Sequence, residues 1–307
     1  MNPEILVVGS LNMDLVVNLP RLPQRGETLT GSHFATFPGG KGANQAVAAA
    51  RAGGRVSMLG SVGADDFGQQ LLESLHQSGV ATEPVSQRTD VTTGVALITV
   101  DEHGENTIVV VPGANGTVSV ADLNRAESLI AEVKALVLQL EIPIEAVDRA
   151  VTLAKKHHIP VVLNAAPAAQ LSAATLDGLA YLIVNETELE LVSGVPDSDD
   201  LSAAGERLLA RGVQHVVVTL GARGVYVHSA REKFHLPAHT INVVDSTAAG
   251  DAFAGAFTTA LVRGAGLREA AAWGNAAGAL AVSKAGAQPS LPTRAEIIRC
   301  MDGEVQL

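Results

Sequence analysis

The sequence predicts an α/β protein built on a doubly wound, mostly parallel β-sheet flanked by helices. Of its 307 residues, 47% are hydrophobic but only 3% are aromatic, so alanine and the aliphatic residues must fill the core. Alanine-rich helices packed on valine-rich strands are typical of a layered α/β sheet. Short apolar runs also alternate with helical patterns along the chain, which favours parallel strands joined by right-handed crossovers.

Short, continuously apolar runs predict the buried strands. They cover residues 5–9, 135–140, 160–163, 181–184 and 215–220. Helical patterns follow at residues 144–157 and 201–211, and the last third of the chain is mostly helical, over residues 250–262, 267–284 and 293–301.

Two stretches, residues 14–37 and 92–111, break this alternation because they are rich in β-formers and contain little helix. Residues 94–100 and 107–111 flank a polar turn and predict a hairpin. A small sheet split between the two stretches would form a lid on the main domain, which then comprises residues 1–13, 38–91 and 112–307. A lid strand with a free apolar edge favours pairing with a second copy of the chain.

The composition argues against several classes of protein, among them nucleic-acid-binding and membrane proteins. A net charge of −11 argues against general binding of nucleic acid or of an anionic membrane. The single cysteine, Cys300, cannot form an internal disulfide, which suits a reducing compartment. No signal peptide is visible, and no apolar run approaches the roughly 18 residues of a membrane span. We therefore expect a soluble cytoplasmic protein.

The most informative motif is the run from Asp245 to Phe253, which follows a β-like segment at residues 239–244 and opens a helical pattern. Small residues at a helix start leave backbone N–H groups free, and the helix dipole favours an anion there. Asp251, in the same turn, has the place of a base that takes a proton from an attacking hydroxyl. The alternative is an ordinary capped helix, with Asp245 or Ser246 as the cap. The motif alone favours that alternative.

A second glycine-rich motif, residues 39–44, precedes an alanine-rich helix expected at residues 45–52. Glycine lets the backbone approach a ligand closely, and Asn44 offers donors and acceptors to hydroxyl groups. The motif is no Walker A loop, because residue 35 is alanine and glycine follows Lys41. By itself it is equally consistent with a flexible turn.

Polar side chains follow several of the predicted strands. Asn12 and Asp14 come after the first strand, and Glu141 ends the strand at 135–140. Ligands of open α/β sheets bind at the carboxyl ends of strands. Paired acceptors there suit a polyol, although turn residues or a solvated acid would look the same. No G-x-G-x-x-G follows the first strand, which argues against a dinucleotide site.

Two further segments have both a structural and a functional interpretation. Asn185 and Glu188 have the spacing of a capping box, or could hold the water shell of Mg²⁺ near phosphates. Residues 219–224 join two strands through glycines, either as a plain hairpin or as backbone offered to a nucleotide.

Taken together and in this order, the motifs resemble those of the ribokinase family of sugar kinases. The resemblance runs from Ile5 to about Pro292, and the two glycine-rich motifs are its most specific part. It favours the functional interpretation of each motif over capping and turns. It also implies a ribokinase-like fold with a small β-sheet lid.

The resemblance implies ATP-dependent phosphorylation of D-ribose at O5, giving D-ribose 5-phosphate and ADP. Asp251 would be the general base, and the amides of Ala248, Ala249 and Gly250 would form the anion hole for the γ-phosphoryl group. Phosphoryl transfer depends mainly on positioning and charge stabilisation, which such groups supply. The residues expected to hold the sugar, together with Asp251, are Asn12, Asp14, Gly40, Lys41, Gly42, Asn44 and Glu141.

The resemblance also implies a nucleotide site, a magnesium site and a potassium site. The nucleotide site would use Asn185, Thr219, Gly221, Ala222, Arg223, Gly224, Gly250 and Asn275. Asn185 and Glu188 would hold Mg²⁺ through water. A K⁺ ion beside the anion hole would be bound, partly by main-chain oxygens, at Asp245, Thr247, Ala281, Lys284, Gly286 and Ser290. The lid would form a homodimer contact.

Two rival functions stay open at this point. A sibling kinase would phosphorylate 2-deoxyribose, fructose or a nucleoside, but Asn12 suits a sugar hydroxyl, and few aromatic residues are present to stack on a nucleoside base. A non-catalytic sugar- or nucleotide-binding regulator would be expected to lack the base or the anion-hole glycine. Both Asp251 and Gly250 are present, which argues against it.

Overall fold

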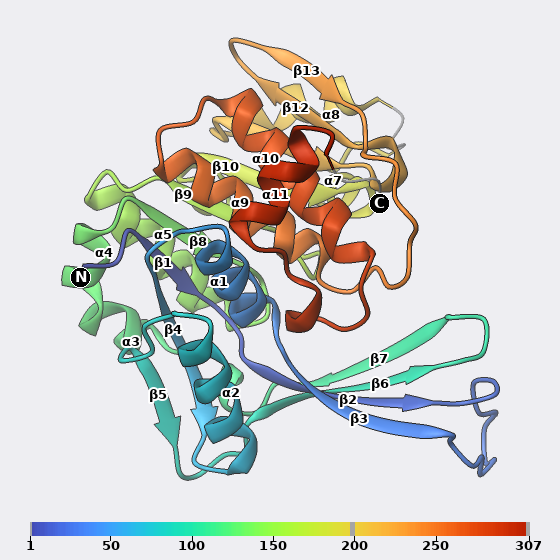
Figure 1. Cartoon of the computed structure of the whole chain (residues 1–307). Helices are drawn as coiled ribbons and strands as arrows, with labels where there is room; N and C mark the ends of the chain where they lie inside the picture. Colours follow the sequence, from blue (N-terminus) through green and yellow to red (C-terminus); the bar gives the residue numbers. More distant parts are fainter. Residues whose placement is uncertain (1, 197–199, 305–307) are drawn as a thin grey trace.

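The computed structural model describes residues 2–196 and 200–304, so the predicted domain ends at residue 1 and at residues 305–307 lie outside it. Its main feature is a nine-stranded sheet in the order β13-β12-β11-β10-β9-β8-β1-β4-β5 (Figure 1). The strands are β1 (Ile5–Val8), β4 (Val56–Gly63), β5 (Val85–Arg88), β8 (Ala135–Leu138), β9 (Val161–Asn164), β10 (Tyr181–Asn185), β11 (His215–Thr219), β12 (Val225–Ser229) and β13 (Lys233–Leu236). All pairs are parallel except β11 with β12 and β12 with β13. The predicted fold class is confirmed.

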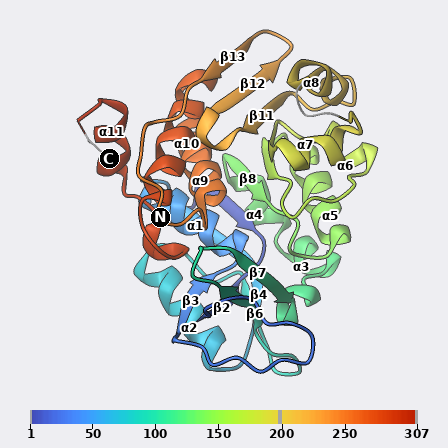
Figure 2. The same cartoon turned by 90° about the vertical axis from the view of Figure 1, so that its right-hand side faces the viewer.

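Helices cover both faces of this sheet (Figure 2). One face carries α1 (Lys41–Arg51), α2 (Asp66–Gln77), α9 (Ala249–Val262), α10 (Leu267–Val282) and α11 (Arg294–Met301). The other carries α3 (Val120–Arg125), α4 (Glu127–Glu132), α5 (Ile144–Lys156), α6 (Ala173–Asp177), α7 (Glu186–Ser193) and α8 (Leu201–Leu209). In β1, Ile5 and Val7 pack in the first layer and Leu6 and Val8 in the second. Burial on both faces explains why the strands are continuously apolar.

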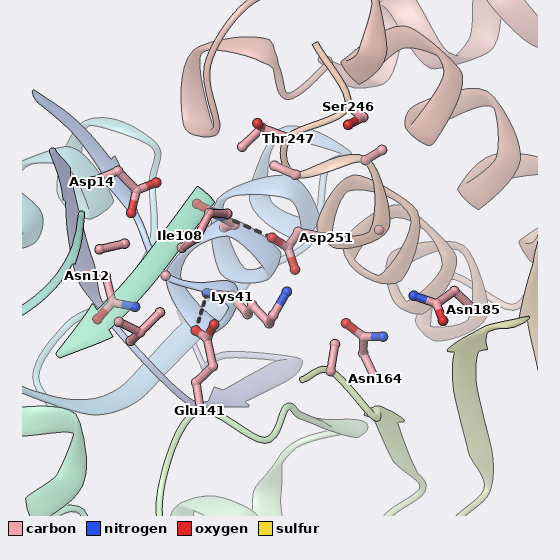
Figure 3. Close-up of a pocket in the computed structure, with 18 of the residues that line it drawn as sticks. Asn12, Asp14, Lys41, Ile108, Glu141, Asn164, Asn185, Ser246, Thr247 and Asp251 are labelled. Carbon is pink, nitrogen blue, oxygen red and sulfur yellow. Dashed lines mark hydrogen bonds between the residues drawn. The ribbon is translucent and has the colours of Figure 1, made fainter. Parts of the chain in front are cut away.

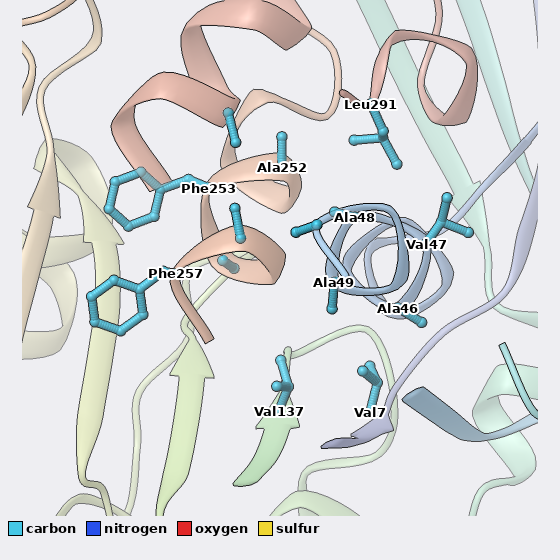
Figure 4. Close-up of a cluster of buried hydrophobic side chains, with 14 of the residues drawn as sticks. Val7, Ala46, Val47, Ala48, Ala49, Val137, Ala252, Phe253, Phe257 and Leu291 are labelled. Carbon is cyan, nitrogen blue, oxygen red and sulfur yellow. The ribbon is translucent and has the colours of Figure 1, made fainter. Parts of the chain in front are cut away.

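Helices α1 and α9 pack unusually closely (Figure 4). A Cβ atom on Gly255 would lie 2.6 Å from the Cβ of Ala48 and from the backbone nitrogen of Ala49. The hydroxyl of Thr259 donates to the carbonyl of Ala49 at 3.0 Å, which links the same two helices. Small residues thus bring the first turn of α1 beside the first turn of α9, although the two helices are about 200 residues apart in the chain.

A second, four-stranded sheet has the order β3-β2-β6-β7 and extends away from the main sheet (Figure 1). Its strands are β2 (Asn12–Asn18), β3 (His33–Gly39), β6 (Gly94–Val100) and β7 (Asn106–Val111). The register pairs Asp14 with Phe37 and Ala96, and Ala96 with Val110, so these side chains share one face. The predicted hairpin at residues 94–111 is confirmed. The sheet is mixed rather than antiparallel throughout, because β2 and β6 run parallel.

Three details differ from the sequence prediction. Residues 239–244 form no strand: the N–H groups of Val244 and Asp245 donate to the carbonyl of Val282, so this segment is tied to the end of α10 instead of a sheet edge. Helix α1 begins at Lys41 rather than at residue 45, because Gly40, at φ = 86°, turns the chain directly into it. The main sheet also contains β4, β5 and β13, which the sequence analysis did not single out. None of the described helices is both long and apolar enough to cross a membrane.

Candidate active site

A cavity of about 360 Å³ opens between the second sheet and the carboxyl ends of the main-sheet strands (Figure 3). Of the residues predicted as site residues, it is lined by Asn12, Asp14, Gly40, Lys41, Asn44, Glu141, Asn185, Glu188, Thr219, Thr247, Ala248, Ala249, Gly250 and Asp251. Side chains of the second sheet close one side of it, namely Ala96, Ile98, Asn106, Ile108 and Val110. The folded chain therefore brings together residues from 12 to 251 around one cavity.

The start of α9 at this cavity is free of a side-chain cap. Its N-cap residue, Ala248, has the left-handed conformation (φ = 61°), which costs a non-glycine residue about 1–2 kcal/mol. Within the described residues, the N–H groups of Ala248, Gly250 and Asp251 donate no hydrogen bond, whereas the N–H of Ala249 lies 3.3 Å from the carbonyl of Ser246. A Cβ atom on Gly250 would meet no atom within 4 Å. Free donors and empty space make this turn suited to an anion.

The capping alternative is wrong for this helix. The carboxylate of Asp245 accepts from the backbone N–H of Thr247 at 2.9 Å and from its hydroxyl at 2.6 Å, and so closes a local turn. Its other oxygen accepts from the N–H of Gly286 at 2.8 Å. Asp245 thus organises the loop before α9, and the N–H groups of the first turn stay available.

Asp251 is 5% exposed and faces the cavity with a fixed carboxylate (Figure 3). Asn44 Nδ2 donates to its Oδ2 at 3.0 Å, and Gln45 Nε2 donates to its Oδ1 at 2.9 Å. Burial raises the pKa of Asp251, while Lys41 and the two amide donors act in the opposite direction. A buried carboxylate with a raised pKa next to free N–H donors is suited to take a proton from a hydroxyl that attacks a phosphoryl group.

Lys41 supplies the positive charge of the cavity. Its backbone N–H donates to Glu141 Oε2 at 3.0 Å, and the hydroxyl of Ser10 donates to the same oxygen at 2.6 Å. Burial tends to lower the pKa of the Lys41 ammonium, but the carboxylates around it, those of Asp251 and Glu141 above all, raise it. Lys41 is therefore charged and balances a group of acids that would otherwise repel one another.

Asn12 and Asp14 enter the cavity from β2. Asn12 Oδ1 accepts from Asn115 Nδ2 at 2.8 Å, and no acceptor among the described residues uses the amide hydrogens of Asn12, which therefore stay available to a ligand. Burial, together with the charges of Glu141 and Asp251, raises the pKa of Asp14 from 3.8 to about 7. A Cβ atom on Gly39 would clash with the Asp14 carboxylate, so this position requires glycine as long as Asp14 keeps its place.

Replacing Asp14 with asparagine should stabilise the protein at pH 8 and weaken ligand binding. Because the folded-state pKa of Asp14 is raised, the folded chain binds more protons than the unfolded chain between pH 3.8 and about 7, and its contribution to stability falls as the pH rises through this window. We expect a gain of about 1–3 kcal/mol for Asp14→Asn at pH 8 and a smaller one at pH 5. Urea unfolding at the two pH values measures this, and an equal effect at both would contradict the assignment.

On the opposite side of the cavity, Asn185 and Glu188 form a capping box at the start of α7. Asn185 Oδ1 accepts from the N–H of Glu188, and Glu188 Oε2 accepts from the N–H of Asn185, both at 2.8 Å. Burial raises the pKa of Glu188. The capping box is confirmed, and both residues also line the cavity, so their role toward Mg²⁺ stays a prediction.

The remaining residues predicted for the nucleotide and the sugar do not line the cavity. Gly221, Ala222 and Arg223 form a 3₁₀ turn, and Arg223 makes an ion pair with Glu186. A Cβ atom on Gly224 would clash with the carbonyl of Leu236, so the hairpin itself requires this glycine. Asn275 Nδ2 donates to the carbonyl of Pro237 at 2.8 Å. The N–H of Gly42 donates to Ser10.

The residues predicted for a monovalent cation lie in two segments joined by Asp245 and Gly286. The carbonyl of Ala281 accepts from the N–H of Lys284, whose ammonium pairs with Glu296 at 2.9 Å. Ser290 is buried and its hydroxyl donates to the carbonyl of Ala287. Over residues 2–196 and 200–304, no group of three or more His, Cys, Asp and Glu side chains is suited to hold a metal ion. A cation here would depend on main-chain oxygens.

Sequence reasoning missed several polar residues at this site: Ser10, Gln45, Asn115, Gln139 and Asn164. All five are buried; Ser10, Gln45, Asn115 and Asn164 each form a hydrogen bond with a residue that lines the cavity, and Gln139 donates to Gln45. Asn164 ends β9 and lines the cavity, so the rule that ligands bind at strand ends could have found it. The same rule applies to Gln139, directly after β8, and to Ser10, shortly after β1, whereas Gln45 and Asn115 have no such signal because their partners are distant in the chain.

Comparisons with known proteins agree with this geometry. Residues 2–294 match the model of the pfkB family of carbohydrate kinases. The chain belongs to this family. Among curated proteins, it is 39% identical to a ribokinase of Haemophilus influenzae, with 98% of this chain and 99% of that protein covered. It is 36% identical to a deoxyribokinase of Salmonella typhimurium, with 94% and 96% covered.

Solved structures of ribokinases share the fold. The structure of Arabidopsis thaliana ribokinase complexed with ribose and ATP aligns with a TM-score of 0.90 at 31% identity, covering 98% of this chain and 99% of that one. Membership of the pfkB family makes this protein a sugar kinase, and the rival interpretation as a non-catalytic regulator is set aside. The roles of individual residues are taken up below as proposals.

Proposed function

We propose that the protein phosphorylates D-ribose at O5 with ATP, giving D-ribose 5-phosphate and ADP. The observation that carries the proposal is the Asp251 carboxylate beside the free N–H groups of the first turn of α9, in one cavity. Relatives named ribokinase at close to 40% identity support ribose as the substrate. Asp251 would take the proton of O5 while the amides of Ala248, Ala249 and Gly250 stabilise the charge on the transferring phosphoryl group.

Charge and hydrogen-bond capacity suggest how the sugar is held. Asp14 and Glu141 offer acceptors, Lys41 offers a cation, and Asn12 has amide hydrogens not used by Asn115. The buried Oδ1 of Asn44 has no partner within the described residues and would accept from a sugar hydroxyl. An unpaired buried acceptor costs about 1–3 kcal/mol, which a bound hydroxyl would remove. Gly40 would contribute backbone atoms, whereas Gly42, which does not line the cavity, would act only by allowing α1 to approach residues 9 and 10 closely.

The nucleotide would lie toward Asn185, Glu188 and Thr219, and extend to Gly221, Ala222, Arg223, Gly224 and Asn275. Glu188 Oε1 accepts no hydrogen bond within the part of the chain that the structure describes, so it fits the water shell of Mg²⁺, with Asn185 beside it. When bound, Mg²⁺ neutralises phosphate charge.

A substrate panel tests the proposal: turnover of ATP with ribose, 2-deoxyribose, fructose or adenosine. We expect ribose to give the highest kcat/KM, and absence of ATP turnover with ribose would refute the assignment. The second candidate is a 2-deoxyribose kinase, which the deoxyribokinase relatives favour. The free amide hydrogens of Asn12 favour a sugar with a further hydroxyl group.

We also propose a K⁺ ion bound by Asp245, Thr247, Ala281, Lys284, Gly286 and Ser290, mostly through main-chain oxygens. Asp245 joins the two segments that carry these residues, and its loop leads directly into the free N–H groups of α9. A cation there would order the loop rather than touch the substrate. Exchanging K⁺ for Na⁺ at constant ionic strength should lower kcat several-fold, and equal rates in a steady-state assay would remove the proposal.

The second sheet, with the boundaries 14–37 and 92–111, is proposed to act as a lid and as a homodimer contact. Its face away from the cavity exposes Phe34 (61%), Leu97 (46%) and Val109 (59%), and β7 has a free edge. Val109→Lys should therefore give a monomer in sedimentation velocity and weaken ribose affinity several-fold. Thr107→Lys on the same face, near the tip of the hairpin, is the control. A Val109→Lys protein that stays dimeric with unchanged affinity would contradict the proposal.

A further inference from the structure

Gln45 lies on the first turns of α1, next to Asn44, but it does not line the cavity. It is fully buried. Its Nε2 donates to Asp251 Oδ1 at 2.9 Å and to Asn164 Oδ1 at 3.0 Å, and its Oε1 accepts from Gln139 Nε2 at 2.7 Å. Both amide hydrogens and the carbonyl oxygen are used, so only one orientation of this carboxamide satisfies its neighbours.

We propose that Gln45 is a positioning residue for the reaction: it fixes the orientation of the Asp251 carboxylate and favours its ionised form, and Gln139 fixes Gln45 in turn. The inference rests on the proposed function, in which Asp251 is the base. It adds a residue that touches neither substrate.

The two amide donors on Asp251 differ in their access to ligand. Asn44 lines the cavity and has an unpaired oxygen, so a bound sugar can engage it. Gln45 is sealed behind Asp251, and no ligand in the cavity can compete for it. Gln45 therefore holds the Asp251 carboxylate whether or not a ligand is bound. A displacement of Gln45 by more than about 0.5 Å would turn the carboxylate away from the reacting hydroxyl.

Gln139 stabilises this orientation of the Gln45 carboxamide. Its Nε2 serves Gln45, while its Oε1 is buried without a partner in the described part of the chain. Turning the Gln139 amide would place its Oε1 against the Oε1 of Gln45, so that two carbonyl oxygens face each other and the hydrogen bond between the two side chains is lost. A Cβ atom on Gly9 would clash with Gln139 Oε1, so glycine at position 9 makes room for the amide. Gly9 thus leaves room for Gln139, Gln139 donates to Gln45, and Gln45 donates to Asp251.

The charges around Asp251 set the expected direction of a pH effect. Lys41 on α1, Glu141 after β8, Asp14 on β2 and Glu188 on α7 all act on it. A donor to a carboxylate favours the ionised form, so removing the Gln45 donor should raise the pKa of Asp251. A larger share of the base is then protonated at neutral pH, and activity returns as the pH is raised.

Gln45→Met tests this, since methionine has a similar length and no hydrogen-bonding group. With ribose and ATP we expect kcat at pH 7 to fall about 10- to 100-fold, the KM for ribose to stay within about threefold, and the acid limb of the kcat profile to move to higher pH. Thr259→Val is the matched control, because it removes a buried hydrogen bond between α9 and α1 that does not involve Asp251. It should lower thermal stability and leave the acid limb in place.

A wild-type kcat and acid limb in Gln45→Met would overturn the proposal, as would the same alkaline shift in Thr259→Val. Asp251→Asn separates this failure from that of the proposed function: full turnover in Asp251→Asn refutes the base itself, whereas an inactive Asp251→Asn beside a normal Gln45→Met refutes only the positioning role. If Gln45→Met does not fold, Gln139→Met is the second variant. It keeps the hydrogen bonds from Gln45 to Asp251 and Asn164 but removes the one that Gln139 donates to Gln45, so the Gln45 side chain is less firmly held. A smaller alkaline shift there supports the proposal, and no shift overturns it.

Discussion

Replacing Asp251 with asparagine should lower kcat by about 10²- to 10⁴-fold and leave ribose affinity within a few-fold of its original value. Asparagine keeps the size and the burial of the side chain but cannot accept the proton of the attacking hydroxyl. The sugar contacts proposed for Asn12, Asp14 and Lys41 are untouched. A coupled assay of ADP release measures kcat, and isothermal titration with ribose measures affinity.

Asp65→Asn is the matched control, because it makes the same change at the start of another helix. Asp65 caps α2 by accepting from the N–H of Gly68, and it does not line the cavity. Its carboxylate also accepts from the N–H and the hydroxyl of Thr93, so asparagine should lower stability, but the cavity is unchanged and activity should persist. Near-normal turnover in Asp251→Asn would refute the assignment of the base.

Gly250→Ala should abolish most activity without destabilising the protein. The added methyl group meets no protein atom within 4 Å, so it projects into the space proposed for the transferring phosphoryl group. Losing one oxyanion-type donor costs about 10²- to 10³-fold in kcat, and a methyl group that keeps the phosphate from the amides should cost at least as much. Alanine is also the better helix former, so the free energy of unfolding should be unchanged or up to about 1 kcal/mol higher.

A loss of activity with retained stability is the distinguishing result, measured by ADP release and by urea unfolding. Gly266→Ala at the start of α10 is the control, since a Cβ atom there also meets nothing within 4 Å but lies away from the cavity. A Gly250→Ala protein with normal kcat would show that the anion does not approach this turn.

Local patterns predicted much of the fold. Strands β1, β8, β9, β10 and β11 lie within one or two residues of their predicted ends, because burial on both faces makes parallel strands continuously apolar. The prediction of a β-like segment at residues 239–244 was wrong because these residues are not buried in a sheet. They have β-propensity, but Val243 and Val244 are 65% and 59% exposed, and no strand pairs with them among the described residues. Propensity without a neighbouring edge does not make a strand.

The candidate site was predicted unevenly. Residues that a motif names or that end a strand, such as Asp251, Asn44 and Glu141, line the cavity as expected. Of the supporting amides, Gln45 was missed because an isolated glutamine in a helix carries no pattern, whereas the rule for strand ends could have found Gln139. The raised pKa of Asp14 could not be foreseen either, since it depends on burial and on the charges of Glu141 and Asp251.

The sequence by itself determined the layered α/β fold, the family and the two glycine-rich turns. Hydrophobic periodicity and the backbone freedom of glycine depend only on residues that are close together in the chain. The tertiary structure alone decided which carboxylate is buried, which N–H groups stay free and which amides hold the base. These depend on close packing between distant segments, above all that of Gly255 on Ala48, which sets Gln45 within hydrogen-bonding distance of Asp251. Hydrogen bonds and desolvation act over a few ångströms, and only the folded chain fixes such distances between residues some 200 positions apart.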